Sequence, residues 1–118
     1  GRVPVWVGGV LPARRPLRRA ARWQGAVPIA YADGQLVRPG PDQLAAAGET
    51  IAAERGSLDD FDLVVWDRVA AGPTAAAALR AEIPAHQRLG VTWWIESPVP
   101  GRDRDWMALL RDRVATGV

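Results

Sequence analysis

Cysteine and lysine are both absent from this chain of 118 residues. Without cysteine the chain has no disulfide, no thiolate ligand for a metal and no cysteine nucleophile. All 15 basic residues are therefore arginine, and the 13 acidic residues leave a net charge of only +2. A net charge this small does not by itself indicate nucleic acid, and we expect no nucleic-acid partner.

Histidine and long apolar runs are equally scarce. His86 is the only histidine, and neither metal-ligand spacing nor a nucleophile-elbow motif accompanies it, so we predict no metal site and no serine–histidine triad. No apolar run approaches the roughly 20 residues of a membrane span, and no signal-peptide pattern opens the chain. We therefore expect a soluble cytoplasmic protein without a membrane partner.

The length is that of one small domain, so we expect a single domain over residues 1–118. The chain begins at Gly1, and its only methionine is Met107. This start leads us to expect a processed chain or a fragment of a longer protein.

Short apolar runs alternate with helical patterns along the whole chain. The expected strands cover residues 3–7, 26–30, 61–67 and 91–95, and each is bounded by glycine, proline or aspartate. The first expected helix has Pro16 in its first turn, and the second has Pro41 and Gly56 at its ends. Two further helices are expected over residues 74–89 and 106–114. Pro84 is expected to break or kink the third helix, and residues 31–40 are expected to form a loop.

Four strand–helix units in this order favour an α/β fold with a parallel sheet. Right-handed crossovers then place all the helices on one face of the sheet. Since a complete eight-unit barrel has about 250 residues, the chain is close to half of one. We predict the parallel (βα)4 half of a TIM barrel.

In such a barrel the chemistry lies at the carboxyl ends of the strands. Gly8 and Gly9 follow the first strand, where they indicate either a phosphate-binding turn or an ordinary tight turn. Asp67 and Glu96 follow two later strands, where each is either an acid–base group or the partner of an arginine or a turn.

Arginine is concentrated in the first third of the chain, and tryptophan forms one adjacent pair. Residues 14–22 include five arginines, which form either an anion site or a solvated, salt-bridged helix face; we favour the second reading because residues 39–118 carry an excess of acid. Trp93 and Trp94 should point to opposite faces of their strand, and His86 should be structural or exposed to solvent.

Three stretches carry a family resemblance. Residues 3–9 (VPVWVGG), 15–25 (RPLRRAARWQG) and 90–97 (GVTWWIES) have the order and spacing found in one family. Together they resemble the carboxyl-terminal half of the luciferase-like monooxygenases. These are TIM-barrel oxidoreductases that use flavin mononucleotide (FMN) or a deazaflavin coenzyme.

The resemblance implies where the cofactor would bind. It places Gly8, Gly9 and Val10 near the cofactor phosphate, at the end of the sixth barrel strand, and Glu96 near the end of the eighth. Gln24 departs from the acid expected before Gly25, and the first four or five strands of the family's barrel are missing from this chain. The resemblance therefore assigns no catalytic residue, and we expect the half barrel alone to be inactive.

An alternative function belongs to another class. A cofactor-free half-barrel module would act in self-association or in protein interaction. In either case a half barrel leaves two strand edges and an inner face uncovered. We therefore expect a homodimer, a larger assembly, or a complex with a chain that carries the other half.

Overall fold

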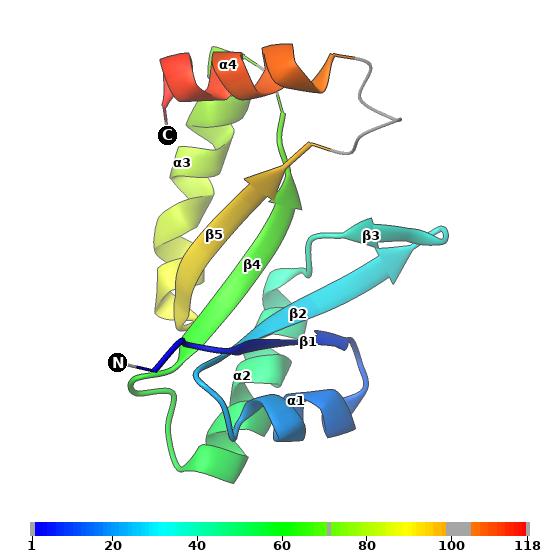
Figure 1. The fold of residues 1–118 in the computed structure, drawn as a ribbon, viewed down its shortest axis with the longest axis vertical. Coiled ribbons are helices and arrows are strands. Elements are labelled where there is room, and N and C mark those ends of the chain that lie inside the picture. The colour runs from blue at the N-terminus through cyan, green and yellow to red at the C-terminus, as the bar shows by residue number, and fades with distance from the viewer. Residues whose placement is uncertain (1, 71, 99–104, 118) are drawn as a thin grey trace.

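Four parallel strands form the centre of the computed structural model, which describes residues 2–70, 72–98 and 105–117 (Figure 1). The strands are β1 (Trp6–Val10), β2 (Gly25–Ala32), β3 (Gln35–Val37), β4 (Asp62–Arg68) and β5 (Val91–Ser97). The helices are α1 (Arg14–Ala20), α2 (Pro41–Arg55), α3 (Pro73–Arg88) and α4 (Trp106–Thr116). In the described part of the chain, no helix combines the length and apolarity needed to cross a membrane.

The sheet has the strand order β1-β2-β4-β5, and every neighbouring pair along it is parallel. Because this order follows the sequence, the structure confirms the predicted α/β fold with (βα)4 half-barrel architecture. The short β3 pairs antiparallel with β2 and lies off this path.

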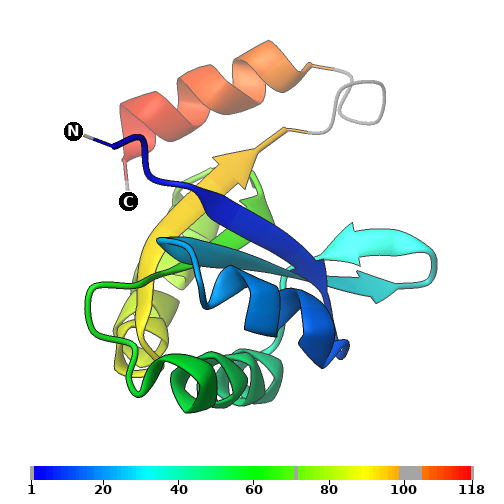
Figure 2. The ribbon, with the colours of Figure 1, turned by 60° about the horizontal axis from the view of Figure 1, so that its bottom comes forward.

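The core lies between one face of the sheet and the helices α1 and α2 (Figure 2). It contains Leu17, Ala20, Ala21, Ala26, Leu44, Ala47, Ile51, Phe61, Leu63, Val65 and Val91. On α2 the core residues recur every three or four positions, and on β4 they alternate, as amphipathic helices and strands require. Pro41 begins α2, and Gly56 ends it with a φ of 97°, as predicted.

The first strand lies later in the sequence than predicted. It begins at Trp6 and ends at Val10, so Gly8 and Gly9 are inside the strand rather than in the turn after it. A Cβ atom at Gly9 would lie 2.7 Å from Cβ of Pro16 in α1. Gly9 is therefore the residue that allows α1 to pack directly against β1.

The predicted loop over residues 31–40 is largely a β-hairpin. Strand β2 continues to Ala32 and turns back into β3 through Asp33 and Gly34, which have φ values of 53° and 72°. Two positive φ values in a two-residue turn are typical of a type I′ hairpin, for which Asp-Gly is a favoured pair. That dipeptide was the available signal, and the loop prediction overlooked it.

The last helix does not join the helical layer, contrary to the prediction that all helices cover one face. Helix α4 lies across the carboxyl ends of β4 and β5, away from α1 and α2 (Figures 1 and 2). None of its residues is buried, and Val114 is 84% exposed. Helix α3, in contrast, continues through Pro84 without a break.

Pro28 marks the point where the sheet begins to separate. The Leu11 N–H donates to the Ile29 carbonyl at 2.8 Å, so the backbone of Ile29 faces β1 and that of Pro28 faces β4. Proline has no N–H to offer β4 there, and the ladder between β2 and β4 ends at Ala26. Beyond this point β2 and β4 diverge (Figure 1).

These contacts generate a stability prediction for neighbouring glycines. Gly9→Ala should lower the free energy of unfolding by about 1–3 kcal/mol, because the new methyl group overpacks against Pro16. Gly8→Ala is the matched control, since a Cβ there meets only Ile29 Cδ1 at 3.8 Å. Urea denaturation of both variants measures the difference. Equal losses would contradict close packing at Gly9.

Candidate functional site

The sheet face opposite α1 and α2 has no helical layer over it in the described structure, and we call it the open face. Strand alternation and the core on the other side assign its residues, and a register shift in β5 places both Thr92 and Trp93 on this face. They are Trp6, Gly8 and Val10 of β1, Val27, Ile29 and Tyr31 of β2, Asp62, Val64 and Trp66 of β4, and Thr92, Trp93 and Ile95 of β5.

Trp6 crosses the open face at the amino ends of the strands. Its indole Nε1–H donates to Oδ2 of Asp62 at 3.1 Å, and its ring centre lies 5.5 Å from that of Trp93. The indole passes over Gly25 of β2, where a Cβ atom would lie 2.5 Å from Trp6 Cδ1. The hydroxyl of Thr92 donates to the other carboxylate oxygen of Asp62 at 3.0 Å. One side chain therefore connects all four parallel strands.

Several large apolar side chains on the open face remain exposed. Trp93 is 52% exposed, Tyr31 56% and Val10 44%. Soluble monomers expose single apolar residues routinely, and here three lie on the same face of one sheet, which makes that face a candidate binding surface. The predicted opposite orientation of the tryptophan pair is confirmed, because Trp94 packs on the core side against His86, with ring centres 4.9 Å apart.

The backbone of β1 offers donors along its outer edge. Leu11 donates toward β2, so the alternating N–H groups of Gly8 and Val10 point away from β2. Strand β1 has no other neighbour in the described sheet. These N–H groups are suited to a phosphate or to the edge of another strand.

Glu96 is held in an ion pair at the carboxyl end of β5. Its Oε2 lies 2.8 Å from Nε of Arg113, and Nη2 of Arg113 donates to Oε1 at 3.0 Å. The two side chains are only 16% and 10% exposed. The same Nη2 donates to the Ala70 carbonyl at 3.0 Å, so this pair fastens α4 to the sheet.

Asp67 is also paired. Arg38 reaches its carboxylate at 3.3 Å and that of Glu82 in α3 at 2.8 Å, while the guanidinium lies 5.1 Å from the ring centre of Trp94. Nδ1 of the buried His86 donates to the Glu82 carbonyl at 2.9 Å. His86 therefore has a structural place, one of the two outcomes expected for it.

The sequence-derived site residues are not gathered in one place. Gly8 and Val10 lie on the open face at one edge strand, Gly9 faces α1, and Glu96 lies on the other edge strand. Alternation places the Glu96 and Asp67 side chains on the helix side rather than the open face. Trp6 and Gly25 were not identified, because their contact joins residues that are distant in sequence.

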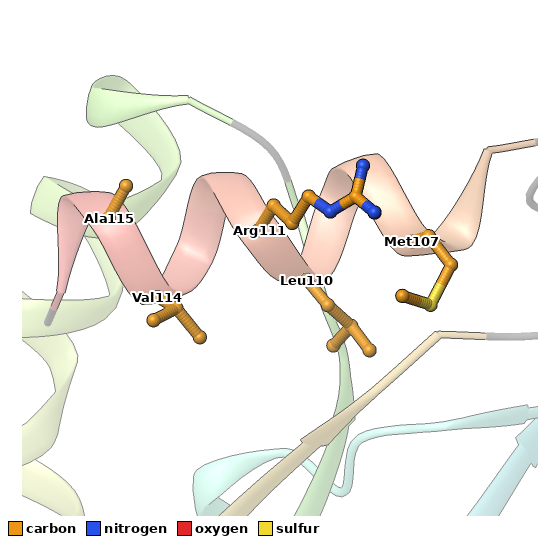
Figure 3. A pocket seen from close by; sticks show the side chains of 5 residues that line it. All are labelled: Met107, Leu110, Arg111, Val114 and Ala115. Carbon is orange, nitrogen blue, oxygen red and sulfur yellow. The ribbon is translucent and has the colours of Figure 1, made fainter.

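Two hollows lie outside the open face. One, of about 510 Å³, lies between α1 and α2 and includes Leu11, Leu17 and Ala46. The other, of about 310 Å³, lies along α4 and is lined by residues of that helix. The side chains of Leu110 and Val114 extend from the same side of the helix (Figure 3). Neither contains a predicted site residue.

Among residues 2–70, 72–98 and 105–117, no cluster of histidine and carboxylate side chains is arranged to hold a metal ion. Comparisons with protein families, with curated proteins and with solved structures found no match. The likeness to luciferase-like monooxygenases therefore rests on the sequence motifs alone.

The ion pair at the strand ends generates a second prediction. Arg113→Leu should lower the free energy of unfolding by about 2–3 kcal/mol, because the carboxylate of Glu96 is left without its partner in a poorly solvated position. Chemical denaturation measures the loss, and Glu96→Gln in the same chain should recover part of it. Arg111→Leu, on an exposed part of the same helix, is the control. An equal loss in the control would exclude a special role for the pair.

Proposed function

We propose that the chain is one half of a luciferase-like oxidoreductase barrel and that its open face contributes to an FMN or deazaflavin site. The exposed indole of Trp93 on that face is the observation that carries the proposal. Two of the three motifs behind the family resemblance include β1 and β5, the strands that bound the open face, and the third lies on α1. Two of the three motifs therefore indicate the same surface as the geometry.

The residues of the open face fit a flat ring. Trp93 of β5 pairs with Val64 of β4, and Gly8 of β1 pairs with Val27 of β2. Val27 and Val64 come directly after the paired residues Ala26 and Leu63, so Gly8 and Trp93 lie in the same row across the sheet. Trp93 offers an aromatic surface for stacking. Gly8 has no side chain, and only Ile29 Cδ1 lies near the place of a Cβ atom.

The phosphate side of the cofactor would lie along β1. The outward N–H groups of Gly8 and Val10 are donors, whereas Gly9 serves packing against Pro16. Glu96 would act indirectly, because its ion pair with Arg113 positions α4 beside the strand ends. A bound flavin or deazaflavin would itself supply the hydride or oxygen chemistry, and the chain would bind it and shield it from water.

A binding measurement tests the proposal. FMN and a deazaflavin coenzyme are titrated separately, with ligand fluorescence and thermal stabilisation as readouts. Trp93→Ala should weaken binding of the preferred cofactor about tenfold, a loss of about 1.4 kcal/mol. Trp23→Ala is the matched control, since Trp23 is similarly exposed at 45% but lies after α1, outside the open face.

The outcomes separate two functions. Binding that depends on Trp93 and not on Trp23 supports the cofactor half barrel. If neither cofactor binds, the proposal of a cofactor half barrel is overturned. A cofactor-free interaction module then remains as the function. That module is the second candidate, because both strand-end carboxylates, Asp67 and Glu96, are occupied by ion pairs rather than free for chemistry.

We further propose that the open face and the two sheet edges are covered by a second copy of the chain or by a chain with the other half barrel. Strands β1 and β5 are the outer members of the parallel sheet. Pairing β1 of one copy with β5 of the other gives a closed two-fold arrangement without free edges. The exposed side chains of Val10, Trp93 and Ile95 would then be removed from water.

Sedimentation velocity at micromolar concentration tests this assembly. We expect a mass at least twice the 12.7 kDa of the chain. Ile95→Lys, on the open face, should shift the chain toward monomer because a charge would enter the interface. Leu36→Lys on the projecting β3 is the control, with 38% exposure against 36% for Ile95. A soluble, cooperatively melting monomer without either substitution would contradict the proposal.

A further inference from the structure

Five arginines form one continuous surface on and just after α1. They are Arg14, Arg15, Arg18, Arg19 and Arg22, which we call the arginine face. The spacing of 3.6 residues per turn places the four arginines within α1 on less than half of the helix circumference, and Arg22 lies in the turn that follows the helix. Leu17, Ala20 and Ala21 are buried on the opposite side, so the arginine face points outward from the sheet.

Most of this surface has no partner within the described chain. Arg18 pairs with Glu54 of α2 at 3.3 Å, and both side chains remain largely exposed. The other four guanidinium groups form no ion pair or hydrogen bond in the described structure and are exposed. The sequence favoured a solvated, salt-bridged face, and the structure shows one salt bridge and four solvated guanidinium groups. Together they leave a concentrated positive charge at the surface.

An exposed aromatic ring follows the arginine face in the sequence. Trp23 comes directly after Arg22, in the turn after the end of the helix at Ala20, and its ring is 45% exposed. Guanidinium groups bind phosphate oxygens in a bidentate manner, and an indole ring is a stacking platform for a base. Phosphate and base are both present in nucleic acid.

The small net charge led us to expect no nucleic-acid partner, but the arginines are concentrated on one surface. We propose that the arginine face and Trp23 bind single-stranded nucleic acid, with the phosphate backbone along Arg15, Arg19 and Arg22 and a base stacked on Trp23. Helix α1 extends over about 9 Å from Arg14 to Ala20 at 1.5 Å per residue, and Arg22 follows it, which is enough for a few nucleotides. Glu54 repels phosphate on the side next to α2, which directs the strand to the other side. This surface lies on the helix layer, so it is independent of the open face.

The same observations disfavour an anionic membrane. Interfacial helices insert an apolar face into the lipid, but the apolar face of α1 is buried against the protein. An acidic protein surface would match the charge yet leave the exposed Trp23 without a role. Single-stranded nucleic acid uses both features.

Fluorescence anisotropy with a labelled 12-nucleotide oligothymidylate tests the proposal across a salt series. The triple variant Arg15→Gln, Arg19→Gln, Arg22→Gln should bind at least tenfold more weakly at low salt. The slope of log affinity against log salt should fall by about 2, because each lost phosphate contact on a single strand contributes about 0.7. Glutamine has nearly the helix propensity of arginine, and circular dichroism verifies the fold.

The control has the same net charge with arginines removed elsewhere. Arg80→Gln, Arg88→Gln, Arg111→Gln changes three exposed arginines on α3 and α4 and should retain most of the affinity. Trp23→Ala should weaken binding several-fold, whereas Trp106→Ala, at 39% exposure, should not.

Three outcomes would overturn the proposal. They are no binding of the oligonucleotide, an equal loss in both triple variants, or arginine-dependent binding to vesicles with 30% anionic lipid in place of the oligonucleotide. Titration of FMN and of the deazaflavin coenzyme into the triple variant of the arginine face distinguishes the nucleic-acid proposal from the cofactor proposal. Since its substitutions lie on the helix layer, unchanged cofactor binding is expected whichever way the nucleic-acid test ends.

Discussion

The passage of the Trp6 indole over Gly25 is the contact on which the rest of the sheet depends. A side chain at position 25 would collide with both the indole and the backbone of Asp62, so only glycine allows β1, β2 and β4 to be bridged there. The indole N–H bond to Asp62 and the ring contact with Trp93 then extend the bridge to β5. The amino ends of the strands are thereby held together, which gives the open face a defined shape at that end.

The carboxyl ends of the strands are held by a different kind of contact. After Pro28 the ladder between β2 and β4 stops, and ion pairs rather than backbone hydrogen bonds connect the elements there. Arg38 ties β4 to α3, and Arg113 ties β5 to α4. Since α4 has no buried residue, its attachment relies on polar contacts, including the Gly72 N–H bond to Asp112 at 2.7 Å. These ion pairs engage the strand-end carboxylates of Asp67 and Glu96, which are therefore not free to act as acid–base groups.

The two surfaces proposed for binding are chemically unlike and lie on opposite sides of the sheet. The open face is aromatic and apolar, with backbone donors at its edge, which suits a flat cofactor or another sheet. The arginine face is charged and belongs to the helix layer. A barrel completed through the open face would still present the arginine face to solvent, so both functions are compatible in one molecule.

The sequence by itself determined the fold class and most of the local structure, although it placed the first strand too early and missed the hairpin of β2 and β3. Alternating apolar runs and helical periodicities depend on neighbours a few residues away, and they predicted four parallel strands in chain order, the ends of α2 at Pro41 and Gly56, and the opposite orientations of Trp93 and Trp94. Only the tertiary structure decided the rest, because those outcomes depend on atoms distant in sequence. Gly9 was expected in a turn, either phosphate-binding or ordinary, and only the position of Pro16 shows that it lies within β1 and allows α1 to pack closely. For Glu96 the sequence left an acid–base group and the partner of an arginine open, and only the placement of α4 across the strand ends shows the pair with Arg113.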